Sequence, residues 1–104
     1  MNSKTPLRDT EVDAIAKPRH ESDKEHVAEA ERIRQAVRQA VKKAIQDNRH
    51  KGHKAQIDAA TRAAKEVRCA DPKKIDKVKI TITGKDPDGD KVTHEITVTP
   101  SANK

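Results

Sequence analysis

The sequence predicts a small α+β protein of order α-α-β-β, in which two antiparallel helices pack on a C-terminal two-stranded β-hairpin. Three features indicate this class: a long stretch with helical periodicity, a shorter one behind it, and two alternating segments around a proline-aspartate-glycine turn. At 104 residues the chain is expected to form one domain over residues 22–99. Residues 1–21 and 100–104 are predicted to be tails.

The N-terminal segment, residues 1–21, is polar, contains two prolines and shows no sustained pattern. We therefore expect a flexible, disordered tail. Within it, Thr10 and Asp13 resemble a helix start, with Val12 and Ile15 on one side. This feature is typical either of a transient turn or of a short docking motif that folds on a partner.

The first predicted helix covers residues 23–49. Ser22 occupies the N-cap position and Glu25 follows three residues later, which is a capping-box pattern, while Gly52 is the C-cap candidate. Apolar residues recur three and four positions apart and form one stripe along the helix: Val27, Ala30, Ile33, Val37, Val41 and Ile45.

The second predicted helix covers residues 54–70 and has an alanine-rich apolar stripe that includes Ile57, Ala60 and Val67. The link between the helices is short and contains a glycine, so we expect the two helices to be antiparallel neighbours. Pro72 ends the second helix, because the residue before a proline is pushed out of the α region.

The hairpin is predicted from two alternating segments, 77–84 and 91–99. The turn between them fits a type I turn closed by a glycine in the left-handed region, which gives a hairpin with a G1 bulge. The resulting register pairs Ile80 with Ile96 and places every apolar residue of the hairpin, together with His94, on one face.

The charge is uneven along the chain. The net charge is +6, and residues 32–74 hold 13 basic and 4 acidic residues, a net charge of +9. Such a field suits an acidic protein or nucleic acid as partner, although lysine and arginine also simply keep small domains in solution. No Phe, Tyr or Trp is present to stack bases, so nucleic-acid binding is expected to use duplex phosphates without sequence specificity. The candidate contacts for an acidic partner or phosphates are Arg38, Lys42, Arg49, Lys51 and Lys54.

Three patterns that resemble chemical sites have simpler explanations. The acidic run 86–90 resembles a calcium loop, but its glycine falls at position four instead of six, and a hairpin turn explains the same residues. Asp47, His50 and His53 have a spacing that would suit metal ligands on a helix, but a glycine interrupts them and ordinary loop histidines explain the pattern. Cys69 is expected to be structural. We therefore assign no catalytic residue, metal or cofactor.

The predicted function is a small, non-catalytic protein-interaction or accessory module that binds a partner through the helix pair or the hairpin edge. The partner is an unidentified protein or a second copy, because a two-stranded sheet has open edges and a core without aromatic residues is thin. The alternative is a basic nucleic-acid-associated protein. One cysteine and the lack of a membrane span or signal-peptide pattern favour a cytoplasmic protein.

Overall fold

The structure is a computed structural model that describes residues 7–69, 72–86, 88–99 and 101–102. Its elements follow in chain order: β1 (Arg8–Pro18), α1 (Lys24–Asp47), α2 (His53–Glu66), β2 (Arg68–Cys69), the 3₁₀ turn η1 (Pro72–Lys74), β3 (Ile75–Lys85), β4 (Lys91–Val98) and β5 (Ser101–Ala102).

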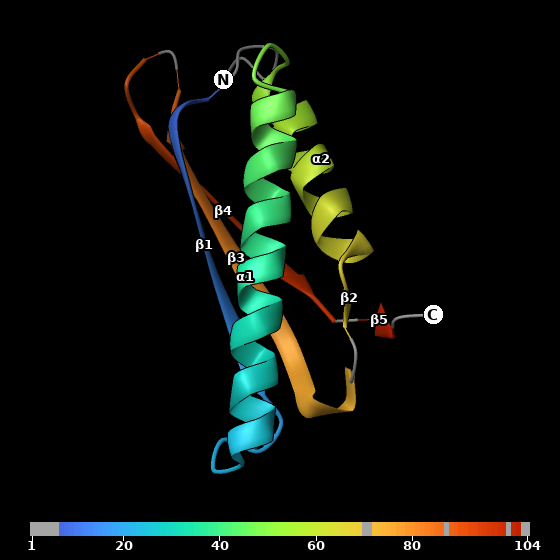
Figure 1. Cartoon of the computed structure of the whole chain (residues 1–104). Helices are drawn as coiled ribbons and strands as arrows, with labels where there is room; N and C mark the ends of the chain where they lie inside the picture. The colour runs from blue at the N-terminus through green and yellow to red at the C-terminus, as the bar shows by residue number, and fades with distance from the viewer. Residues whose placement is uncertain (1–6, 70–71, 87, 100, 103–104) are drawn as a thin grey trace.

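The main sheet has three strands in the order β1-β3-β4, and both pairings are antiparallel. Both helices lie on one face of this sheet, with α1 along β1 and β3 and with α2 beside α1 (Figure 1). A second, very short sheet pairs β2 with β5 in parallel. The chain is thus a two-layer sandwich that leaves the other face of the main sheet uncovered in this single chain.

The predicted order α-α-β-β is wrong. A strand precedes the helices, so the order of the main elements is β-α-α-β-β, and most of the expected disordered tail is the edge strand β1. Residues 1–6 of that tail lie outside the described residues. The signal for β1 was the alternation of Val12 and Ala14, both buried, with exposed Asp13 and Ile15. Val12 and Ile15 lie three residues apart, a spacing that is typical of a helical turn. Ala14 is small, so the alternation of period two that marks a strand was weak.

The start of β1 contains a bulge between Arg8 and Glu11, where Asp9 adopts a positive φ of 50°. Here β1 approaches Gly84 of β3 so closely that an added Cβ would lie 3.0 Å from the Cβ of Leu7. Leu7 is buried, and its backbone N–H donates to Oε1 of the buried Gln56 at 3.1 Å. The bulge and this bond fix the strand against α2.

The helices end close to the predicted positions, but their caps differ. Asp23, not Ser22, caps α1, and its Oδ1 accepts hydrogen bonds from the N–H groups of Glu25 at 2.9 Å and His26 at 3.4 Å. Gly52 precedes α2 as its N-cap and does not terminate α1. The second helix ends at Glu66, earlier than predicted, because the following residues turn into the extended β2.

The hairpin was predicted correctly. Ile80 pairs with Ile96, and Ile82 pairs with His94. The N–H of Asp86 donates to the carbonyl of Asp90 at 3.0 Å, and Gly89 has a φ of 88°, as a G1 bulge requires.

The core lies between the helices and the inner face of the sheet and is wholly aliphatic. The predicted stripe of α1 is buried from Ala30 onward, whereas Val27 is 45% exposed. The largest fully buried apolar side chains come from α1, the start of β3 and its centre: Ile33, Val37, Val41, Ile75, Val78, Ile80 and Ile82.

Candidate functional site

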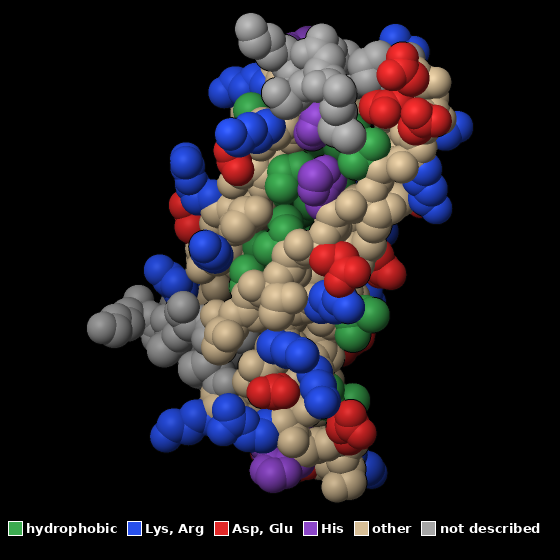
Figure 2. All heavy atoms as spheres, turned by 180° about the vertical axis from the view of Figure 1, so that it is seen from behind, with side chains coloured by type: hydrophobic (Ala, Val, Ile, Leu, Met, Phe, Trp, Pro, Cys, Tyr) green, Lys and Arg blue, Asp and Glu red, His purple; other side chains and the backbone are tan. Residues whose placement is uncertain are grey.

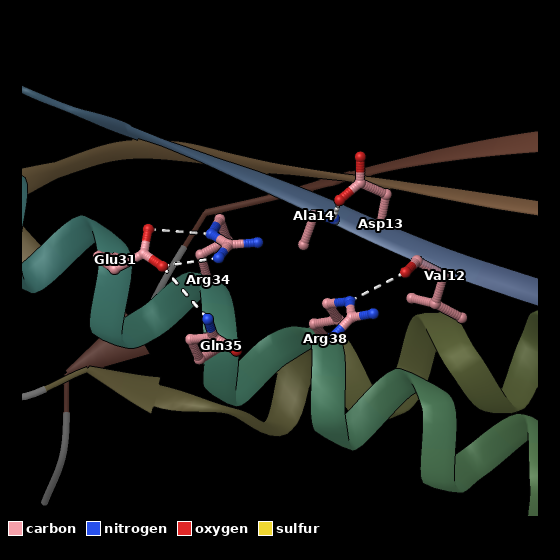
Figure 3. Close-up of polar contacts among 7 residues, drawn as sticks. All are labelled: Val12, Asp13, Ala14, Glu31, Arg34, Gln35 and Arg38. Carbon is pink, nitrogen blue, oxygen red and sulfur yellow. Dashed lines mark hydrogen bonds and ion pairs between the residues drawn. The ribbon is translucent and has the colours of Figure 1, made fainter.

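Side chains occupy part of the free edge of β1. Nε of Arg38, from α1, donates to the carbonyl of Val12 at 3.1 Å, and Oδ1 of Asp13 accepts from the N–H of Ala14 at 3.0 Å (Figure 3). Both backbone groups point away from β3, because β1 bonds β3 through its odd-numbered residues and presents its even-numbered ones to the outside. A further strand therefore finds two of the outward groups of β1 already occupied.

One turn before Arg38, an exposed ion pair lies on the same side of α1. The guanidinium of Arg34 donates to Glu31 at 2.6 and 3.0 Å, and Nε2 of Gln35 adds a bond of 3.2 Å (Figure 3). The Arg34 bonds, with help from Gln35, lower the pKa of Glu31 from its ordinary value, and Glu31 raises the pKa of Arg34. The carboxylate of Asp13 adds to the rise in the pKa of Arg34.

The predicted phosphate-contact residues come from α1, from the link between the helices and from the start of α2. Arg38 is half-buried and bonded to β1, as described above. Lys42 and Arg49 line a groove of about 260 Å³ between α1 and the start of β1. Lys51 and Lys54 are exposed in the link between the helices and at the start of α2, and neither lines this groove.

A larger groove of about 560 Å³ on the same side also contains Lys42 and Arg38, but β1 supplies Glu11 and Asp13 to it. The two carboxylates offset the two cations locally. The net positive charge of residues 32–74 is therefore partly offset on this flank by the acidic residues of β1. From the sequence, these residues were predicted to belong to a tail.

Within the described part of the chain, no side chain is hydrogen-bonded to the free edge of β4 in this way. The bond between Asp86 and Asp90 sets the alternation of the hairpin, so the even-numbered residues of β4 bond β3 and the odd-numbered ones face outward. Among the described residues, no hydrogen bond reaches the outward backbone groups of Thr93, Glu95 or Thr97. An edge strand with unpaired groups is a template for pairing with another chain.

An apolar band lies next to this edge. Figure 2 shows hydrophobic side chains reaching the surface between two charged margins, with histidines among them. Half-buried Ile57 and Val67 at α2 and half-buried Val92 of β4 belong to the incompletely covered part of the core. A strand added to β4 would extend the sheet beneath α2 and cover part of this band.

Two histidines meet at this junction. His53, the first residue of α2, is 7% exposed, and His94 of β4 is half-buried. Their ring centroids are 6.1 Å apart. The Nδ1 atom of His53 and the Nε2 atom of His94 are both buried, and neither has a hydrogen-bond partner within the described part of the chain.

The acidic hairpin turn is explained by its own backbone. Oδ1 of Asp86 accepts from the N–H groups of Asp88 at 3.0 Å and Asp90 at 2.9 Å, which holds the turn closed. The three carboxylates lie within 4.8 Å of one another, and those of Asp88 and Asp90 are exposed. Cys69 lies in β2, and its environment falls outside the described side chains.

Comparison with family models, curated proteins and solved structures finds no match for this chain. In the described residues, no helix has the length and apolarity needed to cross a membrane. The candidate site therefore rests on geometry alone.

Sequence reasoning predicted a contact surface on the helix pair or the hairpin edge, but it missed two features of the structure that bear on this choice. The protection of β1 by Arg38 was hidden because β1 itself was missed. The meeting of His53 with His94 joins residues 41 positions apart, and only the apolar-face position of His94 pointed toward it.

Proposed function

We propose that this chain is a non-catalytic protein-interaction module whose contact surface is the free edge of β4, and that a second copy of the chain is its partner. The observation that carries the proposal is the difference between the two edges of the sheet. Arg38 and Asp13 occupy outward groups of β1, whereas the outward groups of Thr93 and Glu95 are unpaired among the described residues.

The charge pattern of β4 favours a second copy. Antiparallel pairing about Thr93 places Lys91 opposite Glu95 of the partner subunit, and the same pair recurs across the two-fold axis. Within one chain, Lys91 lies opposite Lys85 of β3, a pair of like charges, while Glu95 pairs with Lys79 at 2.9 Å. In the dimer, Glu95 of the partner subunit would lie between its own Lys79 and Lys91 of the first copy, and would offset part of the repulsion at Lys91. The two sheets would join into six strands and remove both open β4 edges.

Reversing the charges tests this register. Lys91→Glu and Glu95→Lys each create like-charge pairs across the two-fold axis, so each should weaken the dimer, and the double variant should restore it. The measurement is sedimentation equilibrium at tens of micromolar, read by interference because the chain lacks Trp and Tyr. A single 11.6 kDa species at every concentration would contradict the second copy as partner.

The control variant is Glu11→Lys, which makes the same change of charge on exposed β1 at the opposite edge. It should leave self-association unchanged. A drop equal to that of Glu95→Lys would mean that net charge, and not the β4 edge, governs association.

A gel shift with duplex DNA across a salt series tests the alternative, a basic nucleic-acid-associated protein. With Arg38 bonded to Val12 and acidic residues on the same flank, we expect only weak binding that disappears between about 50 and 200 mM salt. Tight duplex binding that is lost in Lys42→Gln or Arg49→Gln would favour the alternative.

A further inference from the structure

We propose that His53 and His94 form a binding site for a borderline transition-metal ion such as Zn²⁺. Both imidazoles place a buried nitrogen with no described hydrogen-bond partner at the junction of α2 and β4. Buried polar atoms are nearly always partnered, and a single ion bound by both rings would supply a partner to each of these two nitrogens.

The spacing of the rings suits one shared ion. An ion bound by two imidazole nitrogens at about 2.0–2.1 Å holds the ring centroids roughly 5–6 Å apart. The observed separation is 6.1 Å with an interplanar angle of 36°, slightly wider than that range, so the two rings must move closer together to share an ion. Both histidines belong to regular secondary structure, which holds their backbones in place: His53 begins α2, and His94 is paired with Ile82 in the central strand.

The chemistry of the donors selects the class of ion. Imidazole nitrogen suits Zn²⁺, Cu²⁺ and Ni²⁺, whereas Ca²⁺ and Mg²⁺ require oxygen ligands. Two protein ligands leave further positions for water. His94 is only half-buried, so part of its side chain is open to solvent.

The other candidate groups are already explained. His20 and His26 have ring centroids 5.0 Å apart, and Nδ1 of His26 is also buried without a hydrogen bond of good geometry. This atom lies 3.0 Å from the carboxylate Oδ2 of the N-cap Asp23, however, and neither histidine of the proposed site has such a carboxylate beside it among the described residues. These two histidines therefore serve as a matched control pair. The carboxylate of Asp86 is used by the hairpin turn.

The test is titration of the untagged full-length chain with zinc chloride, followed by calorimetry. We expect saturable binding of one ion per chain at the pair, and the affinity should fall by more than about tenfold in His53→Asn and in His94→Asn. His20→Asn and His26→Asn should bind as the unaltered chain does. Binding that is insensitive to His53→Asn and His94→Asn, or that does not saturate below millimolar zinc, would overturn the proposal.

A second readout does not depend on the variants folding. Long-range ¹H–¹⁵N spectra of the unaltered chain resolve the ring nitrogens of the five histidines. Zinc should shift the resonances of His53 Nδ1 and His94 Nε2 together, in the same titration step. Shifts confined to the other three histidines, or no shift of any ring nitrogen, would refute the site.

Discussion

Aspartate substitutions at two successive positions of β1 test whether this segment is a strand of the sheet or a disordered tail. Ala14 is 2% exposed and faces the helices, while Ile15 is 63% exposed on the outer face, where it pairs with Lys79. An unpaired carboxylate buried at Ala14 costs about 3–5 kcal/mol. A domain of this size has a total stability of about 5–10 kcal/mol, so Ala14→Asp should remove most of it.

The matched variant Ile15→Asp should change stability by no more than about 0.5–1 kcal/mol, because that side chain is already in water. Thermal melts followed by far-ultraviolet circular dichroism measure both, since the chain has no tryptophan to report on unfolding. Ala14→Asp should lower Tm by more than about 10 °C or leave the chain unfolded, and Ile15→Asp should melt close to the unaltered protein. Equal melts for the two variants would refute the placement of β1 in the sheet.

Three further changes test local features. Gly89→Ala should destabilise the hairpin by about 1 kcal/mol, because an L side chain is strained at a φ of 88°, and an unchanged Tm would show that the turn adopts another conformation. Asp23→Ala should lower Tm at neutral pH. The hydrogen bond from His26 depresses the pKa of Asp23. The stabilisation that the Asp23 carboxylate contributes is therefore present above the ordinary carboxyl range and is lost as the pH falls through the depressed pKa. A Tm difference that persists at about pH 2 would contradict that origin. Arg38→Gln should expose the carbonyl of Val12 and increase association through β1 as judged by light scattering, whereas exposed Gln39→Ala should not.

The elements with strong local signals were predictable from the sequence. The hairpin register followed from turn chemistry and alternation, which agree on Ile80 opposite Ile96. The stripe of α1 followed from its period, and burial of Val37 and Val41 confirms it. In each case, one short stretch of sequence contains the whole cause of the structure.

The strand β1 was not predictable in the same way, because its stability comes from distant residues. Its partners are in β3, from 57 positions away (Pro18 and Ile75) to 77 positions away (Arg8 and Lys85), and Ala14 is too small to show the alternation clearly. Ile15 is exposed although it is apolar, so counting it as a core residue gave the wrong periodicity, since apolar residues are not always buried. The protection of Val12 by Arg38 and the contact between His53 and His94 depend on that missed topology.

The central claim is that two copies pair through β4 about Thr93, and disulfide cross-linking tests it most directly. With Cys69→Ser as background, Thr93→Cys places two thiols at a hydrogen-bonded pair, whose Cα atoms are about 5.5 Å apart and within disulfide range. Mild oxidation should convert Thr93→Cys to a covalent dimer quickly, while Thr81→Cys, on the central strand and the same outer face, should remain monomeric. Equal cross-linking of the two variants, or none for Thr93→Cys at concentrations where sedimentation shows a dimer, would contradict pairing through β4.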